Sequence, residues 1–247
     1  MLNYVEYGKE NKYDDDIFFQ KYSQMSRSQQ GLAGAGEWET LRKLLPDFKD
    51  KRVLDLGCGY GWHCIYAMEH GASSVVGVDI SHKMLEVAKE KTHFPQVEYK
   101  CCAIEDVEFP EESFDVILSS LAFHYVADYE ILVKKIYRIL KSGGNLVFTA
   151  YGTQDWYYNE KGEILHFPVD NYYYEGKRTA VFLGEKVTKF HRTLTTYLNT
   201  LLSNGFIINH IVEPQPPENM MDIPGMQDEM HRPMMLIVSA NKNCYTT

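Results

Sequence analysis

Short apolar runs alternate with helical patterns over residues 52–150 of this 247-residue chain. Five runs are typical of buried strands: Val53 to Leu56, Ser74 to Ile80, Val97 to Cys102, Phe114 to Ser119 and Asn145 to Thr149. The segments between them favour helices, because apolar residues recur there at helical spacing: Trp62 to His70, the residues after Ser81, and Asp128 to Leu140. This alternation predicts βαβ units, right-handed crossovers and a mostly parallel sheet covered on both faces.

The residues before this region are more polar. Phe18, Tyr22 and Met25 share one face of a predicted helix over Asp15 to Met25. The Ser/Gln/Gly-rich stretch from Ser26 to Gly36 predicts a loop, and a helical pattern resumes from Trp38 to Leu45.

The rhythm breaks again over residues 151–190. Ten of these forty residues are aromatic, or 25%, against 13% for the whole chain. This composition predicts an inserted cap that either covers a pocket or forms a contact between subunits, and both alternatives stay open.

A helix through Leu194 and Leu201 follows the cap region. Two strands, Phe206 to Val212 and Met234 to Ser239, have no helix between them and predict an antiparallel pair at the sheet edge.

Composition narrows the classes of partner. Lys and Arg total 25 against 34 Asp and Glu, a net charge of −9, which disfavours a nucleic-acid backbone or an anionic membrane as main partner. No secretory signal or apolar run of about 20 residues is visible. Five cysteines without CxxC spacing fit a reducing cytoplasm and predict no metal site.

The strongest chemical signal is a glycine-rich turn between the first strand and the first helix of the alternating region. Gly57 and Gly59 let the backbone approach a ligand closely, and the following helix presents free N–H groups at its start. Asp79 ends the next strand, where a carboxylate accepts hydrogen bonds from ribose hydroxyls. We therefore predict a cofactor that contains adenosine. A dinucleotide site would place a third glycine at Trp62, and this chain has none there.

Several motifs in this order resemble the class I S-adenosylmethionine-dependent methyltransferases, in their small-molecule, bacterial-type branch. The motifs are Val53 to Gly61, Val76 to Ser81, Phe114 to Ile117 with Ser119 to His124, and Leu140 to Gly144. The resemblance implies a doubly wound, mostly parallel seven-stranded α/β sheet with an aromatic-rich inserted cap. It divides the chain into a helical lid (1–50), a cofactor-binding core (51–150), the cap (151–190) and a C-terminal part that completes the sheet (191–247).

The resemblance also implies roles for individual residues in binding S-adenosylmethionine and its product S-adenosylhomocysteine. Asp55 and the turn of Gly57, Cys58 and Gly59 would surround the methionine part, and the Ser119 carbonyl would face its amino group. Asp79 would hold the ribose. Around the adenine would lie Ile80, Met84, Ile104 and Glu105, with backbone recognition at 103–104. The lid would contribute Tyr22, Met25 and Arg27.

Two of these roles have simpler alternatives. Arg27 either pairs with the cofactor carboxylate or lies on the surface. Met84 either packs on adenine or packs within its helix.

Methyl transfer is an in-line displacement at a sulfonium, so the protein mainly aligns the reactants and excludes water. A base is needed only when the acceptor must lose a proton. His124, just after the fourth strand, is the best-placed base, and Tyr125 beside it can position an acceptor. Alternatively, His124 only packs. His166 and His191, in or next to the cap, are weaker candidates.

We therefore expect a cytoplasmic methyltransferase of a small molecule, a monomer or a homodimer, without a nucleic-acid or membrane partner. A nicotinamide-dependent oxidoreductase is the first alternative, although no Tyr-xxx-Lys set stands on a fitting helix. The second is a cofactor-binding sensor or partner subunit without turnover. A nucleic-acid methyltransferase is disfavoured, because Ser119 to Ala122 replaces the Asn/Asp-Pro-Pro-aromatic motif of that class.

Overall fold

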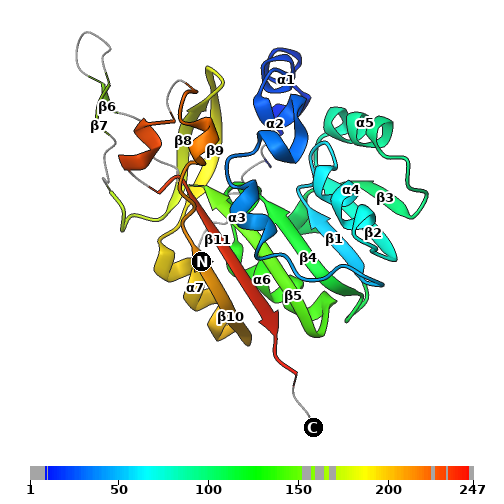
Figure 1. Ribbon diagram of the computed structural model, residues 1–247. Helices are drawn as coiled ribbons and strands as arrows, with labels where there is room; N and C mark the ends of the chain where they lie inside the picture. The colour runs from blue at the N-terminus through cyan, green and yellow to red at the C-terminus, as the bar shows by residue number, and fades with distance from the viewer. Residues whose placement is uncertain are drawn as a thin grey trace.

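The chain folds around one seven-stranded sheet with strand order β10-β11-β5-β4-β1-β2-β3 (Figure 1). The computed structural model describes residues 9, 11–151, 157–158, 164–166, 171–223, 226–231 and 233–244, without the side chains of 151, 157–158, 164–166, 228 and 231. The strands of this sheet are β1 (Arg52–Leu56), β2 (Ser74–Asp79), β3 (Val97–Cys101), β4 (Phe114–Ser120), β5 (Leu140–Tyr151), β10 (Phe206–Val212) and β11 (Met235–Lys242).

All neighbouring strands of the sheet pair in parallel except at β11. Strand β11 lies between β5 and β10 and runs antiparallel to both. This arrangement confirms the mostly parallel α/β fold and the antiparallel last pair that the sequence predicts.

Helices cover both faces of the sheet because side chains alternate along each strand. Val53 and Val75 face one cluster of buried residues, and Leu54 and Val76 face the other. The first cluster is completed by α3 (Trp38–Arg42), α4 (Trp62–Glu69) and α5 (His82–Lys91). The second is completed by α6 (Tyr129–Ile139) and α7 (Leu194–Ser203).

Helix α6 shows how the local sequence fixes an element. The Asp128 side chain accepts a hydrogen bond from the Ile131 N–H at 2.9 Å and so caps the helix start. Leu132, Val133, Ile136 and Ile139 are buried along one face. The helix runs directly into β5 at Leu140, so this strand begins earlier than the predicted Asn145, with a register shift against β4.

The N-terminal residues form η1 (Lys12–Asp14) and α1 (Asp16–Ser23), which confirms the predicted first helix. The predicted loop over Ser26 to Gly36 is wrong, because short helical turns α2 (Ser26–Gln29) and η2 (Gly31–Gly34) form there. Local bonds stabilise these turns in place of an apolar face; the Ser28 hydroxyl, for example, donates to the Tyr22 carbonyl at 2.7 Å. Helix α3 also ends earlier than predicted, at Arg42.

The region predicted as a cap lies outside the main sheet after β5 ends. It contains two antiparallel hairpins, β6 (Tyr157–Tyr158) with β7 (Ile164–His166), and β8 (Gly176–Phe182) with β9 (Glu185–His191). Ala180 and Val187 of the second hairpin bury the side chain of Phe18 on α1. The N-terminal helices and this hairpin therefore lie over the same end of the sheet (Figure 1).

Candidate cofactor and acceptor site

The turn after β1 has the backbone geometry that the glycine spacing predicts. Gly57, Gly59 and Gly61 have φ values of 79°, 53° and 75°, in the left-handed region that strongly favours glycine. A Cβ atom on Gly57 would lie 2.4 Å from the Cβ of Ala122. A side chain at position 57 would therefore collide with the loop after β4, and the turn keeps its backbone open to a ligand.

Asp79 connects the end of β2 to this turn. One carboxylate oxygen accepts a hydrogen bond from the Gly59 N–H and the other from the Ser81 N–H, both at 2.9 Å. Burial raises the pKa of Asp79, whereas these backbone donors oppose the shift. The side chain lines the central cavity, where its remaining acceptor positions suit ribose hydroxyls.

Asp55 lies at the carboxyl end of β1 but does not line the central cavity. It is buried, and the Cys64 thiol donates to its Oδ2 atom at 3.4 Å. Its Oδ1 atom has no hydrogen-bond partner among the described residues. Burial raises the pKa of Asp55 to about 7. An unsatisfied buried acceptor beside the turn fits a cationic or hydrogen-bonding ligand group, so this side chain suits the predicted role without direct exposure to the cavity.

A cavity of about 400 Å³ lies beyond the glycine turn. Of the predicted site residues, those that line it are Tyr22, Met25, Arg27, Gly57, Gly59, Asp79, Ile80, Met84, Ile104, Glu105, His124 and Tyr125. Cys58 lines a smaller neighbouring cavity of about 70 Å³. Met84, Ile80 and the Ala103–Glu105 stretch form a mostly apolar slot next to Asp79 that suits a flat adenine ring.

Ser119 is placed differently from Ser120. Its side chain is buried and its hydroxyl donates to the Leu56 carbonyl at 2.8 Å, so it ties β4 to β1 and does not line the cavity. Ser120 and Leu121 line the cavity instead. Leu121 has a φ of 54°, and its N–H donates to the Thr149 hydroxyl at 2.9 Å. A strained backbone therefore directs the loop after β4 toward the cavity.

Arg27 belongs to the cavity wall and not to the outer surface. Its Nη2 atom donates to both carboxylate oxygens of Glu37, at 3.0 and 2.9 Å. Glu37 is only 2% exposed and also lines the cavity. The predicted cofactor-carboxylate ligand is therefore already paired with an acid. Sequence reasoning missed Glu37, because the two residues are joined by turns that had no predicted structure.

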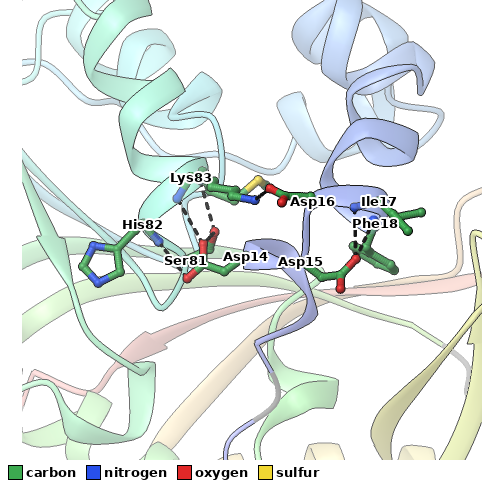
Figure 2. A network of polar contacts seen from close by, with 9 residues as sticks. Asp14, Asp15, Asp16, Ile17, Phe18, Ser81, His82 and Lys83 are labelled. Carbon is green, nitrogen blue, oxygen red and sulfur yellow. Dashed lines mark hydrogen bonds and ion pairs between the residues drawn. The ribbon is translucent and has the colours of Figure 1, made fainter.

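The N-terminal segment is attached to the cofactor side of the site by Asp14. Its carboxylate accepts hydrogen bonds from the Ser81 hydroxyl at 2.6 Å, the Lys83 N–H at 3.1 Å and the His82 N–H at 3.3 Å (Figure 2). These donors lie at the N-terminus of α5, where negative charge is favourable. They lower the pKa of Asp14 despite its partial burial.

The next two aspartates have other tasks. Asp15 caps α1 by accepting from the Ile17 and Phe18 N–H groups, and Asp16 forms an ion pair with Lys83 (Figure 2).

The loop after β4 carries the predicted acceptor residues on η4 (Phe123–Tyr125). His124 is 2% exposed and lines the cavity. Burial, followed by the positive charges of Lys189 and Arg192, holds the pKa of His124 well below its usual value. Its imidazole is therefore neutral near pH 7. The Tyr125 hydroxyl lies 3.1 Å from the hydroxyl of Tyr13, so it contacts the N-terminal segment.

The far wall of the cavity comes from the predicted cap, for which the sequence left a pocket cover or a subunit contact open, and from the β10–β11 connection, which was not assigned to the site. The cap contributes Phe182 and Lys189. The connection between β10 and β11, together with the first residue of β11, contributes an apolar, sulfur-rich surface, consisting of Pro214, Pro216, Pro217, Met220, Ile223, Met226, Met234 and Met235. Pro214, Pro216 and Pro217 of this connection thus belong to a cavity wall.

Of the two weaker histidine candidates, the structure describes the side chain of His191. The Nε2 atom of His191 lies 2.8 Å from the Tyr172 carbonyl, and His191 does not line the cavity. The side chain of His166 lies outside the described residues. Tyr173 and Tyr174 are 87% and 78% exposed, whereas the Tyr172 hydroxyl accepts from the Leu194 N–H. Among the described residues of the cap, Phe182 and Lys189 line the cavity, whereas Tyr172, Tyr173 and Tyr174 do not.

Comparison with known proteins identifies the class. Residues 54–148 match the family model described as a methyltransferase domain. A crystal structure of a candidate S-adenosylmethionine-dependent methyltransferase from Listeria monocytogenes is 53% identical, with a TM-score of 0.81 over 86% of this chain and 99% of that one. A crystal structure of an S-adenosylmethionine-dependent methyltransferase from Mesorhizobium loti is 39% identical, with a TM-score of 0.78 over 86% of this chain and all of that one.

This chain belongs to the S-adenosylmethionine-dependent methyltransferases, and its cofactor is S-adenosylmethionine. An uncharacterized protein of Haemophilus influenzae is 33% identical over 93% of this chain and 96% of its own length. Among the described residues, no helix is long and apolar enough to cross a membrane, and no cluster of His, Cys, Asp or Glu in that part of the chain could hold a metal ion.

Proposed function

We propose that this protein transfers the methyl group of S-adenosylmethionine to a small molecule bound in the same cavity. One observation carries the proposal. A single cavity joins the slot of Asp79, Met84 and Glu105 to the loop of His124 and Tyr125. A donor held at the first position therefore faces an acceptor held at the second without crossing bulk solvent.

Methyl transfer mainly requires that the methyl donor and the acceptor are held in line. When bound, S-adenosylmethionine supplies an electrophilic methyl group on a positively charged sulfur. Asp79 is placed to orient the ribose, and Gly57 and Gly59 allow the backbone to approach the methionine part. The covering residues Tyr13, Tyr22 and Arg27 restrict water, which favours displacement over competing hydrolysis.

We assign His124 a proton-handling or hydrogen-bonding role toward the acceptor. Its imidazole is neutral near pH 7 because of burial and two nearby positive charges, and a neutral imidazole can accept a proton. Arg192 supports its position, donating to the carbonyls of Phe123, Val126 and Ala127. Tyr125, bonded to Tyr13, is placed to orient an acceptor.

A small acceptor fits the enclosure and the charge of the protein. The cavity is about 400 Å³, within the usual range of small-molecule sites. The net charge of −9 disfavours a nucleic-acid acceptor. The free cysteines among the described residues, Cys58, Cys64, Cys101, Cys102 and Cys244, support a reducing cytoplasm. We propose a monomer or homodimer, which size-exclusion chromatography with light scattering tests.

The first experiment is calorimetric titration of S-adenosylhomocysteine into the wild type and Asp79→Ala. We expect micromolar binding to the wild type and an affinity at least about tenfold weaker in the variant, on the order of 1.4 kcal/mol. The variant loses the ribose ligand and the bond that positions Gly59. Asp16→Ala is the control, because Asp16 pairs with Lys83 at the surface.

Circular dichroism establishes that each protein is folded. No binding to folded wild type would contradict the proposal, and nicotinamide dinucleotides would then be titrated for the oxidoreductase alternative. If the cofactor binds, transfer of a radiolabelled methyl group to small-molecule extracts tests turnover. Tight binding without transfer to any extract would favour a sensor or partner subunit.

A further inference from the structure

The central cavity and the smaller cavity of about 70 Å³ share one wall. The residues that line both are Tyr22, Arg27, Glu37, Gly57, Gly59 and Ser120. The adenine slot of Ile80, Met84 and residues 103–105 lines only the central cavity. The shared wall therefore lies at the glycine-turn end of the site, where the amino-acid end of S-adenosylmethionine is expected.

Arg27 and Glu37 are the charged side chains of this shared wall. Arg27 lies on α2, and Glu37 directly precedes α3. The Arg27 Nη2 atom donates to both oxygens of Glu37, and neither side chain has another hydrogen bond to a described residue. A guanidinium group and a carboxylate can each make several more hydrogen bonds than this. Both groups therefore keep unused donors and acceptors at the cavity.

The burial of this ion pair is costly for the fold. The Glu37 side chain is 2% exposed and that of Arg27 is 22% exposed. The attraction within a buried pair offsets the loss of water only when further hydrogen bonds satisfy both groups. Stability of the fold is thus a weak reason for two charges at this position, whereas a ligand that completes their hydrogen bonds is a strong one.

The other titratable groups that line the smaller cavity are uncharged near pH 7. Burial lowers the pKa of His63 to about 4. Burial raises the pKa of the remaining groups, which are Tyr22, Cys58 and Tyr60. Asp55, the acid behind the glycine turn, lines neither cavity. A ligand at this end of the site therefore meets the charges of Arg27 and Glu37.

The position of Asp79 gives the direction in which the cofactor extends. Electrostatic interactions join the Tyr22 phenol both to the Arg27–Glu37 pair and to Asp79, so the pair lies near the predicted ribose position. With the ribose at Asp79 and the adenine in its slot, the amino-acid end of the cofactor points toward the pair.

We propose, on the basis of the methyl-transfer function above, that Glu37 and Arg27 together recognise the zwitterionic amino-acid end of the cofactor. The Glu37 carboxylate accepts hydrogen bonds from the ammonium group, and the Arg27 guanidinium donates to the carboxylate. The two charges of the cofactor are attached to one carbon atom, and those of the protein are 2.9 Å apart, so four charges of alternating sign meet. Glu37 is thereby a specificity-determining residue that favours an amino acid over an uncharged group on the cofactor sulfur.

The test uses four ligands that share adenosine and sulfur and differ only at the amino-acid end. S-adenosylhomocysteine carries both charged groups. The carboxypropyl ligand, 5′-S-(3-carboxypropyl)-5′-thioadenosine, lacks the ammonium group, and the aminopropyl ligand, 5′-S-(3-aminopropyl)-5′-thioadenosine, lacks the carboxylate. 5′-Methylthioadenosine lacks both. Calorimetry measures the affinities, and competition with S-adenosylhomocysteine measures those of weak ligands.

Each variant should lose affinity for a different pair of ligands. In Glu37→Gln we expect S-adenosylhomocysteine and the aminopropyl ligand to bind at least about tenfold more weakly, whereas the carboxypropyl ligand binds no more weakly than to the wild type. In Arg27→Gln the two ligands with a carboxylate should weaken, and the aminopropyl ligand should not. Glu39→Gln is the matched control, because Glu39 of α3 pairs with Arg42 and is 60% exposed. It should change no affinity.

The affinity for 5′-methylthioadenosine should be the same in all variants, which shows that they are folded and keep the adenine slot. Equal weakening of all four ligands in Glu37→Gln would mean that Glu37 only holds the N-terminal segment, and would overturn the proposal. An aminopropyl ligand that binds this variant as it binds the wild type would also overturn it. If Glu37→Gln does not fold, the Arg27→Gln series decides by the same criterion. Absence of S-adenosylhomocysteine binding to folded wild type would instead contradict the methyltransferase function itself.

Discussion

Asp55 and Asp79 are buried carboxyl groups at the ends of neighbouring strands, and both are costly to ionise. Burial raises the pKa of both, that of Asp55 to about 7. Backbone N–H donors stabilise the Asp79 carboxylate, whereas Asp55 receives only a thiol hydrogen bond. The cofactor-free protein therefore carries a poorly satisfied acid next to the expected position of the methionine part of a cationic cofactor.

Asp55 makes the stability of the cofactor-free protein depend on pH. In an unfolded chain its pKa is about 3.9, whereas in the folded protein it is about 7. Between these values the folded protein binds a proton that the unfolded chain has released, so the free energy of unfolding falls as pH rises and levels off above the folded pKa. In Asp55→Asn we expect a shallower slope, by roughly 2–4 kcal/mol in total between pH 4 and 8.

Urea denaturation at several pH values, without cofactor, measures this slope. The exposed Asp16→Asn variant should parallel the wild type, because Asp16 is 95% exposed. A slope in Asp55→Asn as steep as that of the wild type would show that the acid titrates normally.

Residues within the motifs were predictable because their spacing is local. The turn of Gly57 and Gly59 directly follows the first strand of the alternating region, and Asp79 ends the next strand. Glu37 and Lys189 were not predictable, because each reaches the cavity from a segment whose path depends on tertiary packing. The predicted Arg27 does reach the cavity, but its bond to Glu37 required the three-dimensional arrangement of α2 and α3.

At the scale of elements, α5 is held at its start by two separate caps. The first cap is local: the Ser81 hydroxyl oxygen accepts from the Met84 N–H. The second comes from the N-terminal segment, where the Asp14 carboxylate accepts three hydrogen bonds from Ser81, His82 and Lys83. The hydrogen bonds of Asp14 attach the N-terminal segment, whose Tyr13, Tyr22 and Arg27 line the cavity, to the helix that carries Met84. The position of the N-terminal segment and the stability of α5 are therefore linked.

Asp14→Ala should lower the free energy of unfolding by about 1 kcal/mol, the usual effect of losing a cap. It should also weaken S-adenosylhomocysteine binding severalfold, because Tyr13, Tyr22 and Arg27 approach the cavity from the same segment. The adjacent Asp16→Ala is the control and should cost less than about 0.5 kcal/mol, since its ion pair is exposed. Urea denaturation and calorimetry measure both quantities. Equal effects of the two substitutions would count against a specific role of Asp14.

The strands of the sheet were predictable because buried runs of apolar residues have few alternatives. The stretch over Ser26 to Gly36 was not, since α2 and η2 bury little and depend on single bonds such as that from Ser28 to the Tyr22 carbonyl. The start of β5 at Leu140 was not predictable, because Gly143 and Gly144 are typical of a turn. They lie instead within a strand that changes register against β4.

At the scale of the whole molecule, the cavity collects walls from separate parts of the chain. The N-terminal segment, the loops after β1, β2, β3 and β4, the β8–β9 hairpin and the β10–β11 connection all contribute. Figure 1 shows the N-terminal helices and the β8–β9 hairpin over one end of the sheet. Ligand binding should therefore stabilise regions that are remote in sequence.

Hydrogen exchange tests this assembly. With saturating S-adenosylhomocysteine, we expect slower exchange in residues 57–61 and 79–85, and also in residues 13–27, because the ligand binds the closed arrangement and shifts the equilibrium toward it. The exposed turn of Asn171 to Tyr174 is the internal control and should not change. Protection confined to residues 57–85 would mean that the N-terminal segment does not cover the cofactor.

The position of β11 has a consequence for how the protein emerges from the ribosome. This strand follows all others of the sheet in sequence yet lies between β5 and β10, so β10 has no permanent neighbour until residues 235–242 have been synthesised. The apolar, sulfur-rich surface of the cavity ends at the same strand, with Met234 and Met235. A nascent chain can therefore assemble the loops that bind the cofactor while the acceptor side of the cavity is still open. The cavity is completed when the last strand of the sheet has been synthesised.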